Sequence, residues 1–441
     1  MNELLDCPAW WNGKDIVESI FCEEFIKEYK IAYDSNAFFT PEGRMTDDLA
    51  MRCEIYHRLK ICAVKNIPHT INNITELLKY YDAGVDLTPQ QDRVHLANGT
   101  LFMDGTFVEG KQEIVRTRLP VQYNPEAPKP ETWLRFLHDL LNEDDIPTLQ
   151  EYLGYCLIPS TKGQRMMVIK GNGGEGKSQI GVVLNSILGS YMKDGSIAKI
   201  SENPFARADL EHQLLMIDDD MKMEALKQTN YVKSIVTAQG KMDLERKRQQ
   251  SYQGWMFCRL LAFSNGDLQA LYDRSNGFYR RQLILTTKDK PANRIDDPDI
   301  ADKMKAETEG ILLWMFEGLQ RLITNKFQFT ESEHTRSNRE FVKRDSVNLL
   351  DFLEDEGFVR LKPGSSASSK DIYETYSMWC DENALTAMKP RSVSDFLVAN
   401  AKKYNLEHTN TITNSAGRRV WGFHGIELLV KPFASAYSNF H

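Results

Sequence analysis

Apolar residues recur along the first part of this chain at the spacing of α-helices, and the spacing then changes. Over residues 10–87 apolar positions follow a helical period among Glu and Lys, most clearly over residues 16–33. Over residues 94–123 the apolar runs become short and are joined by Asn-Gly and Asp-Gly turns, which are typical of β-hairpins. The pattern predicts a mainly helical N-terminal domain over residues 1–125 that includes a small hairpin region.

A proline-rich segment at residues 123–130 marks the first domain boundary. Beyond it, four apolar runs have the length of strands, and an amphipathic helix is predicted at residues 307–323. Residues 330–345 are highly charged and are typical of a solvated helix or a linker. We therefore place a second domain at residues 126–330. The four apolar runs are residues 165–170, 214–217, 255–263 and 282–285.

A third pattern begins near Leu349, where helical segments surround a Gly-Ser-rich stretch. We predict a turn at residues 363–369. Ser368 and Asp371 have the spacing of a helix cap, so a helix is expected to begin there. This helix would continue to Asn383.

A helix predicted over residues 392–404 precedes two apolar runs, 406–413 and 420–426, which would form a hairpin. Helices followed by a two-stranded wing resemble a winged-helix domain, which we place at residues 345–441. In that arrangement the helix would enter the major groove of duplex DNA. A small structural domain with scattered surface lysines is the alternative. The candidate DNA contacts are Lys402, Lys403, Arg418 and Arg419.

Composition limits the classes of protein that fit this outline. The 441 residues include 41% hydrophobic and 26% charged residues, which is ordinary for a globular protein. No apolar run approaches the roughly 20 residues that cross a membrane, and the start lacks the features of a signal peptide, so we expect a cytoplasmic protein without a membrane partner. The seven scattered cysteines form no C-x-x-C pair, so neither a zinc site nor a disulfide framework is expected. The net charge of -8 still allows a local basic lining that binds nucleic acid.

The clearest motif is a glycine-rich loop between a predicted strand and a predicted helix. Residues 171–178 fit the pattern G-x-x-x-x-G-K-[ST], which holds nucleotide phosphates. In such a loop backbone N–H groups surround phosphate oxygens, Lys177 reaches the β- and γ-phosphates, and the Ser178 hydroxyl binds Mg2+. The predicted nucleotide-binding residues are Gly171, Asn172, Gly173, Gly174, Glu175, Gly176, Lys177 and Ser178.

Polar residues follow two of the later apolar runs. The run at residues 214–217 ends in Asp218, Asp219 and Asp220. A buried strand that stops in carboxylates suits a magnesium-nucleotide site, where one acid holds hydrated Mg2+ and a second orients the attacking water. A strand that runs into a solvated acidic turn is the alternative. Asn265 follows the next run, and an amide there can hydrogen-bond the attacking water.

Two basic groups accompany these motifs. The first lies within residues 240–248, and such a cluster taken alone is commonly a solvated charged segment. The second is the pair Arg280 and Arg281, which can be a surface pair or can supply an arginine finger that neutralises charge on a transferring phosphoryl group. The first group consists of Lys241, Arg246, Lys247 and Arg248.

In their order and spacing these motifs resemble those of the superfamily 3 helicases. The resemblance covers most of residues 90–330, and it points to the helicase part of phage, plasmid and poxvirus-type primase-helicases, including replication helicases of staphylococcal mobile elements. Lys177 and Ser178 match the Walker A residues. Asp219 and Asp220 best match the Walker B acids, with Asp219 holding Mg2+, although the triple aspartate leaves the register open by one residue.

The resemblance also implies roles for the later motifs. Asn265 matches the sensor residue, and Arg280 and Arg281 match arginines that reach across a subunit interface to a neighbour's ATP. The implied fold class is multidomain α/β, with a helical N-terminal domain, an AAA+ P-loop core around a mostly parallel sheet, and a C-terminal winged-helix-like domain. The positions that match the segment carrying a DNA-gripping hairpin are Lys233, Gly240 and Lys247.

The family implies a homohexameric ring with ATP at each interface and DNA in the central channel, where the basic cluster would grip backbone phosphates. We expect an ATP-dependent DNA helicase of a mobile element in the cytoplasm of a bacterial host. It would act on single-stranded and forked DNA, and on origin duplex through its C-terminal domain. Relatives often carry a primase domain, whereas this chain begins almost directly in the helical region, so a separate primase is expected. The alternatives are a DNA-binding ATPase that does not unwind, such as an initiator, packaging or remodelling motor, and a small-molecule kinase.

Overall fold

In the computed structural model, the chain divides into two compact units, Met1–Arg339 and Glu340–His441. Among the described residues, no helix is both long enough and apolar enough to cross a membrane. The structure describes residues 8–62, 64–81, 83–221, 229–265, 276–291, 296–345, 348–383, 385, 387, 390–399, 401–413 and 417–430.

The first unit begins with three helices that pack around a shared apolar core, beside a small antiparallel sheet. The first helix is shorter than the pattern over residues 16–33 predicts, because Lys30 takes a left-handed φ of 52° and the chain then enters the sheet. The first hairpin of this sheet turns at Ser35 and Asn36, both at positive φ, the geometry that suits the twist of paired strands. The sequence pattern does not predict this sheet. The elements are α1 (Glu18–Tyr29), β1 (Ala32–Asp34), β2 (Ala37–Thr40), β3 (Gly43–Arg44), α2 (Leu49–Leu59) and α3 (Ile67–Leu78).

A second antiparallel sheet follows, and it confirms the predicted hairpin region. Strand β5 (Gly99–Phe102) pairs with β4 (Arg93–Leu96) on one side and with β6 (Phe107–Glu109) on the other. Leu96 and Leu101 are buried in the same apolar core as the central sheet. The small sheet therefore packs directly against the middle part of the chain.

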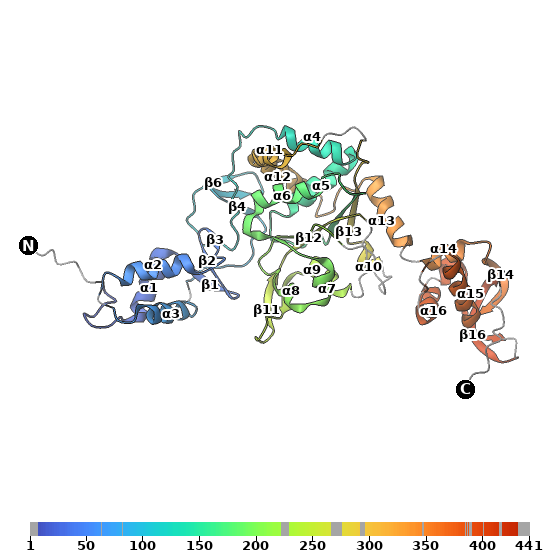
Figure 1. Ribbon diagram of the computed structural model, residues 1–441. Helices are drawn as coiled ribbons and strands as arrows, with labels where there is room; N and C mark the ends of the chain where they lie inside the picture. The colour runs from blue at the N-terminus through green and yellow to red at the C-terminus, as the bar shows by residue number, and fades with distance from the viewer. Residues whose placement is uncertain are drawn as a thin grey trace, which may run out of the picture. The chain divides into compact units, whose positions relative to one another are not determined.

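A five-stranded sheet forms the centre of the first unit, and all of its neighbouring strand pairs are parallel. This arrangement bears out the prediction of an α/β core. In spatial order the strands are β13 (Gln282–Thr286), β7 (Met166–Lys170), β12 (Arg259–Ser264), β9 (Leu215–Asp218) and β8 (Met192–Asp194). Figure 1 shows helices on both sides, with α5 (Ile146–Tyr155), α6 (Ser178–Leu188) and α12 (Thr308–Thr324) on one side and α7 (Ile197–Glu202), α8 (Pro204–Ala208) and α9 (Asn230–Val236) on the other.

The apolar run at residues 255–263 is not one strand, as predicted, but parts of two. Strand β11 (Tyr252–Met256) pairs antiparallel with β10 (Gly240–Leu244) in a separate two-stranded sheet, whereas β12 lies in the central sheet. The chain changes sheets just before Arg259, whose buried guanidinium donates hydrogen bonds to three backbone carbonyls, including that of Cys156 at the end of α5. These bonds fix the start of β12 against α5.

The charged segment at residues 330–345 begins inside the first unit, where its first residues hydrogen-bond to a buried carboxylate. The buried Asp145 carboxylate accepts hydrogen bonds from the Ser332 and Thr335 hydroxyls at 2.5 and 2.8 Å. Helix α13 (Glu333–Asp345) begins at these contacts. The other elements of this unit are α4 (Glu131–Leu140), the 3-10 helices η1 (Glu143–Asp145) and η2 (Gly189–Tyr191), α10 (Asn276–Tyr279) and α11 (Ile300–Lys305).

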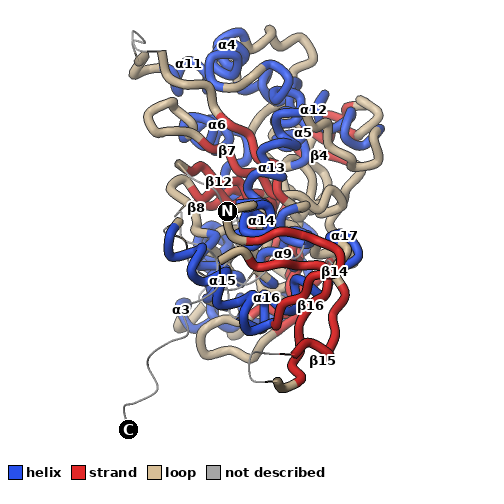
Figure 2. The backbone as a smooth tube through the Cα atoms, turned by 90° about the vertical axis from the view of Figure 1, so that its right-hand side faces the viewer, coloured by secondary structure: helices blue, strands red, loops and turns tan. Residues whose placement is uncertain are grey.

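The second unit combines helices with an antiparallel sheet of three strands, in the order β14-β16-β15 (Figure 2). The predicted turn at residues 363–369 is wrong: residues 363–368 belong to β14, whose pairing with β16 shifts register between Leu361 and Ser366, and Ser369 begins the next helix. The predicted cap is confirmed, because the Ser368 hydroxyl accepts the Asp371 N–H at 3.1 Å. The elements are α14 (Asn348–Glu354), β14 (Val359–Ser368), α15 (Ser369–Glu382), α16 (Pro390–Ala399), α17 (Ala401–Tyr404), β15 (Glu407–Thr413) and β16 (Arg419–Leu428).

Candidate functional site

The glycine-rich loop connects the end of β7 to the start of α6, at the carboxyl edge of the central sheet. Gly173, Gly174 and Gly176 have backbone φ angles of 101°, 79° and 98°, a region that residues with a Cβ rarely adopt. At Gly171 a Cβ would lie 2.7 Å from Lys177 Nζ. Glycine is therefore required for both the turns of the loop and the close approach of the lysine.

Lys177 is buried in the loop and already has acidic and amide partners. Its Nζ donates to Glu175 Oε2 at 2.9 Å and to Asn265 Oδ1 at 3.2 Å. The other carboxylate oxygen of Glu175 accepts the Asn172 N–H. Burial tends to raise the pKa of Glu175, but the hydrogen bonds from Lys177 and from backbone N–H groups outweigh it and hold that pKa below its ordinary value. The Glu175 carboxylate thus accepts hydrogen bonds from Lys177 and the Asn172 N–H, which are donors that a bound phosphate would need.

The three aspartates at the end of β9 have different surroundings. Asp218 is buried, and its Oδ2 accepts the Ile197 N–H at 2.7 Å, at the start of α7. Burial raises its pKa, and the carboxylates of Asp220 and Asp219 add to this effect. Asp219 and Asp220 are exposed and face the same pocket as the glycine-rich loop. The geometry thus gives Asp218 a structural contact and leaves the other two acids open to a ligand.

These groups meet because three parallel strands end together. Ser264 at the end of β12 lies beside Lys170 at the end of β7, and Ala262 lies beside Asp218. The pocket at this edge has a volume of about 940 Å³, within the range of ligand sites. The predicted residues that line it are Gly173, Gly174, Glu175, Gly176, Lys177, Ser178, Asp219, Asp220 and Asn265.

A second wall of this pocket was missed in the sequence. It comes from α4 and from the segment that leads into α11, and it mixes apolar and charged side chains. The apolar spacing of Phe136 and Leu140 indicates one face of a helix but nothing about a ligand. Only the tertiary fold brings this helix opposite the glycine-rich loop. The described residues of this wall are Arg135, Phe136, Asp139, Leu140, Pro291, Asp296, Asp297, Pro298 and Ile300.

The two candidate finger arginines lie away from this pocket. They precede β13, which runs parallel to β7 with Gln282 opposite Met166 and Thr286 opposite Lys170. The two arginines therefore lie at the amino-terminal ends of the strands, about 15 Å along the strand direction from the start of the glycine-rich loop. The Arg281 guanidinium donates to the carbonyl of Gly277, whereas the Arg280 side chain is exposed. Both line a second cavity of about 490 Å³ together with Lys162, Arg165 and Lys326.

The basic cluster lies on the β10–β11 hairpin. Its strands pair from Gly240 opposite Met256 to Leu244 opposite Tyr252, and three of the four cations follow β10 in the connecting turn. Lys241 lies on β10 with its Nζ 5.3 Å from the centre of the Trp255 ring. Figure 1 shows β11 extending beyond α8. The turn carries Arg246, Lys247 and Arg248, and Lys233 lies on α9.

The candidate DNA contacts of the C-terminal part lie in the second unit. Lys402 is exposed on α17, Arg419 is exposed at the start of β16, and Arg418 is exposed directly before this strand. The side chain of Lys403 lies outside the described part of the structure, as do residues 414–416 of the predicted hairpin turn. These cations thus belong to a different unit from the basic hairpin.

Comparisons with known proteins give limited likeness. Residues 169–281, which hold the loop, the acids, the hairpin and the arginines, match a family of unknown function (DUF5906). No curated protein matches the chain. Among solved structures, an A form apo structure of the NrS-1 C terminal region-CTR is 12% identical, with a TM-score of 0.45, and covers 82% of this chain and 91% of that one.

Two further structures of the same NrS-1 region give similar values. The apo structure of residues 305–718 is 11% identical, has a TM-score of 0.44 and covers 77% of this chain and 83% of that chain. An A form of the same region is 11% identical, has a TM-score of 0.47 and covers 91% and 98%.

Proposed function

We propose that this chain is an ATP-dependent DNA helicase that acts in replication of a mobile genetic element. The observation that carries the proposal is the single pocket in which the glycine-rich loop, two exposed aspartates and Asn265 converge. A basic hairpin belongs to the same compact unit. A nucleotide site and a cationic hairpin in one unit provide what a motor on nucleic acid needs.

The residues of the pocket fit a nucleotide with Mg2+. The loop amides and Lys177 would hold the phosphates, and the Ser178 hydroxyl and Asp219 would hold the metal. Bound there, the metal would supply charge neutralisation on the phosphates. Asp220 and Asn265 would orient the attacking water. The α4 wall would border the rest of the nucleotide.

The arginine positions favour a site that is completed by a second copy of the chain. Arg280 lies at the amino-terminal ends of the strands, whereas the glycine-rich loop follows their carboxyl-terminal ends. Arg280 therefore cannot reach a phosphate held in the loop of its own chain. In a head-to-tail ring, however, the amino edge of one copy can face the loop of the next. We therefore propose a homohexameric ring in which Arg280 neutralises charge on the neighbour's ATP.

The hairpin cations would grip the DNA backbone. Lys241, Lys247 and Arg248 are exposed, and contacts to phosphates are independent of sequence, as a translocating motor requires. Lys233, on α9 of the same unit, would supply a further cation. The second unit, through Lys402, Lys403, Arg418 and Arg419, would contact origin duplex DNA.

The experiment that tests the function measures ATP hydrolysis with and without single-stranded DNA, and strand separation on a fluorescent fork. We expect hydrolysis to be stimulated by DNA and the fork to be unwound only with ATP and Mg2+. DNA-stimulated hydrolysis without unwinding would instead indicate an initiator, packaging or remodelling ATPase. Hydrolysis indifferent to DNA would overturn the proposal.

Glu175→Gln is expected to strengthen ATP binding. The Glu175 carboxylate occupies Lys177 and the Asn172 N–H, and it must leave them when phosphate enters. A neutral amide competes less for the lysine, so we expect the KM for ATP to fall about tenfold, the effect of one charged hydrogen bond. The measurement is steady-state hydrolysis, with the exposed Glu202→Gln as control. A higher KM would show that Glu175 instead helps to hold the nucleotide.

A further inference from the structure

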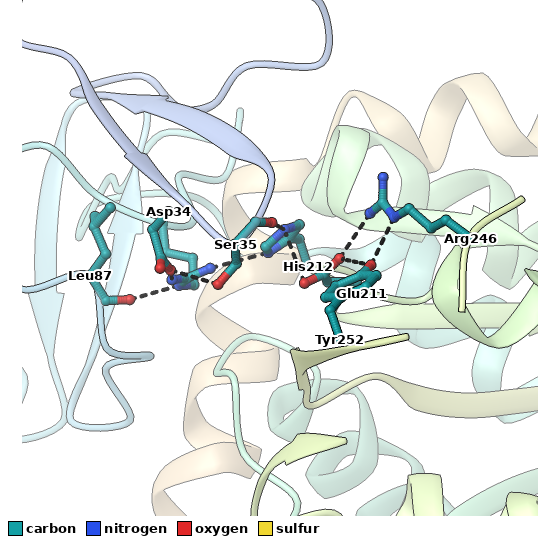
Figure 3. A network of polar contacts seen from close by, with 8 residues as sticks. Asp34, Ser35, Leu87, Glu211, His212, Arg246 and Tyr252 are labelled. Atoms are coloured by element: carbon teal, nitrogen blue, oxygen red, sulfur yellow. Dashed lines mark hydrogen bonds and ion pairs between the residues drawn. The ribbon is translucent and has the colours of Figure 1, made fainter. Parts of the chain in front are cut away.

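One buried carboxylate holds both strands of the basic hairpin near its tip (Figure 3). Glu211 lies in the turn between α8 and β9, and its side chain is fully buried. Its Oε2 accepts hydrogen bonds from the Tyr252 hydroxyl at 2.6 Å and from Arg246 Nη2 at 2.8 Å. Arg246 Nε also donates to the Tyr252 hydroxyl at 2.7 Å. The three groups form a closed set that joins the end of β10 to the start of β11.

The carboxylate also lies directly against the hairpin strand. A Cβ at Gly254 of β11 would be 2.6 Å from Glu211 Oε1, so glycine is needed at that position for the contact. Within the described part of the chain, Oε1 accepts no hydrogen bond. Arg246 and Tyr252 therefore supply the hydrogen bonds that compensate the buried carboxylate of Glu211. If the hairpin moved away, this carboxylate would lose both donors, which is energetically costly.

The next residue fastens the same turn to the N-terminal sheet. His212 Nε2 lies 3.3 Å from the Ser35 carbonyl (Figure 3). Its Nδ1 lies 3.1 Å from Arg116 Nη1. Burial, together with Arg116, lowers the pKa of His212 to about 3, so the ring is neutral, donates from Nε2 and accepts at Nδ1. Arg116 also donates to the Leu87 carbonyl and to Asp34.

The other end of the turn leads into the nucleotide pocket. Strand β9 begins at Leu215, shortly after Glu211, and ends at Asp218, directly before the two exposed acids of the pocket. The turn is therefore attached to the N-terminal sheet, to the hairpin and to the strand that carries Asp219 and Asp220. A displacement of this strand would be passed to the hairpin through Glu211.

We propose that Glu211 is a positioning residue that fixes the basic hairpin relative to β9, and that Arg246 holds the hairpin instead of contacting a DNA phosphate. The consequence for DNA binding rests on the proposed function. Lys241, Lys247 and Arg248 remain the hairpin's contacts to DNA. Their positions depend on the hydrogen bonds among Glu211, Arg246 and Tyr252.

The test compares Glu211→Gln with Glu245→Gln, an exposed acid in the turn of the same hairpin. Both variants remove one negative charge near the basic cluster, so electrostatics alone predicts equal or tighter DNA binding for both. If Glu211 positions the hairpin, Glu211→Gln instead weakens binding of single-stranded DNA about tenfold, while Glu245→Gln does not. Tighter binding by Glu211→Gln would overturn the proposal.

Hydrogen exchange of the hairpin amides, residues 240–256, provides a readout that does not need DNA. We expect exchange to be about tenfold faster in Glu211→Gln and unchanged in Glu245→Gln. Unchanged exchange in both variants would overturn the proposal. If the wild-type chain binds no DNA, the proposed function fails, and exchange alone still decides the role of Glu211.

Two additional variants complete the test. Glu211→Gln combined with Arg246→Gln is expected to bind DNA no more weakly than either single variant, because the two groups act as one unit. Additive losses would show that Arg246 contacts DNA by itself. If Glu211→Gln does not fold, Tyr252→Phe removes one donor and keeps the carboxylate. It is expected to speed hairpin exchange about threefold, and no change would count against the proposal.

Discussion

Replacing Lys177 by alanine is expected to reduce ATP hydrolysis about 10³-fold and to abolish unwinding, while DNA binding is largely kept. Lys177 is the buried cation of the glycine-rich loop, and no other described side chain of that loop is positively charged. Its loss removes charge neutralisation where negative charge develops during phosphoryl transfer. The measurements are steady-state hydrolysis and DNA affinity by fluorescence anisotropy.

Stability has to be separated from chemistry in this test. Lys177→Ala also leaves Glu175 buried without its cation, which costs about 3 kcal/mol of folding stability. The double variant with Glu175→Gln removes that unpaired charge, so we expect its Tm to recover and its hydrolysis to remain lost. Lys193→Ala, which only breaks a partly exposed ion pair with Asp209, is the control. Unwinding by Lys177→Ala would contradict the proposed mechanism.

Arg280→Ala is expected to lower hydrolysis by about 10³-fold as well, although Arg280 is far from the loop of its own chain. The decisive measurement is ATP hydrolysis by a mixture of two variant chains. If each site combines the loop of one copy with Arg280 of the next, an equal mixture of Lys177→Ala and Arg280→Ala chains has about a quarter of its interfaces intact. Hydrolysis should then reappear, although neither variant is active alone.

Arg281→Ala provides the matched control for this experiment. Its guanidinium hydrogen-bonds to the Gly277 carbonyl of its own chain, so it is already committed within the turn. We expect a smaller effect on hydrolysis than for Arg280→Ala. If the mixture stays inactive although both variants assemble, the arginine does not act across an interface.

The local motifs of the site, and the apolar runs that become its strands, are predictable from the residues themselves, whereas the mostly parallel sheet is implied only by the resemblance to a helicase family. The loop, the strand before it and the helix after it follow from residues that are neighbours in the chain, where glycine and apolar spacing directly limit the backbone. The helix cap at Ser368 is of the same kind. Each depends on contacts between residues a few positions apart.

Strand partners and sheet boundaries were not legible in the same way. The run at residues 255–263 is apolar throughout, and nothing in its spacing shows that it divides between two sheets. The Gly-Ser-rich stretch at residues 363–369 has the composition of a turn, yet pairing with β16 makes most of it a strand. In both cases the partner strand is distant in the sequence, and tertiary pairing overrides local preference.

The residue pattern alone predicts a phosphate-type loop, acids and an amide after later strands, and basic residues between them. Which of these groups come together is visible only in the folded chain. Folding buries Asp218, opens Asp219 and Asp220 to the pocket, places Arg280 at the far edge of the sheet, and ties Arg246 to Glu211. A motif limits residue types through local backbone geometry, whereas burial and hydrogen-bond partners depend on segments that are distant in the sequence and meet on folding.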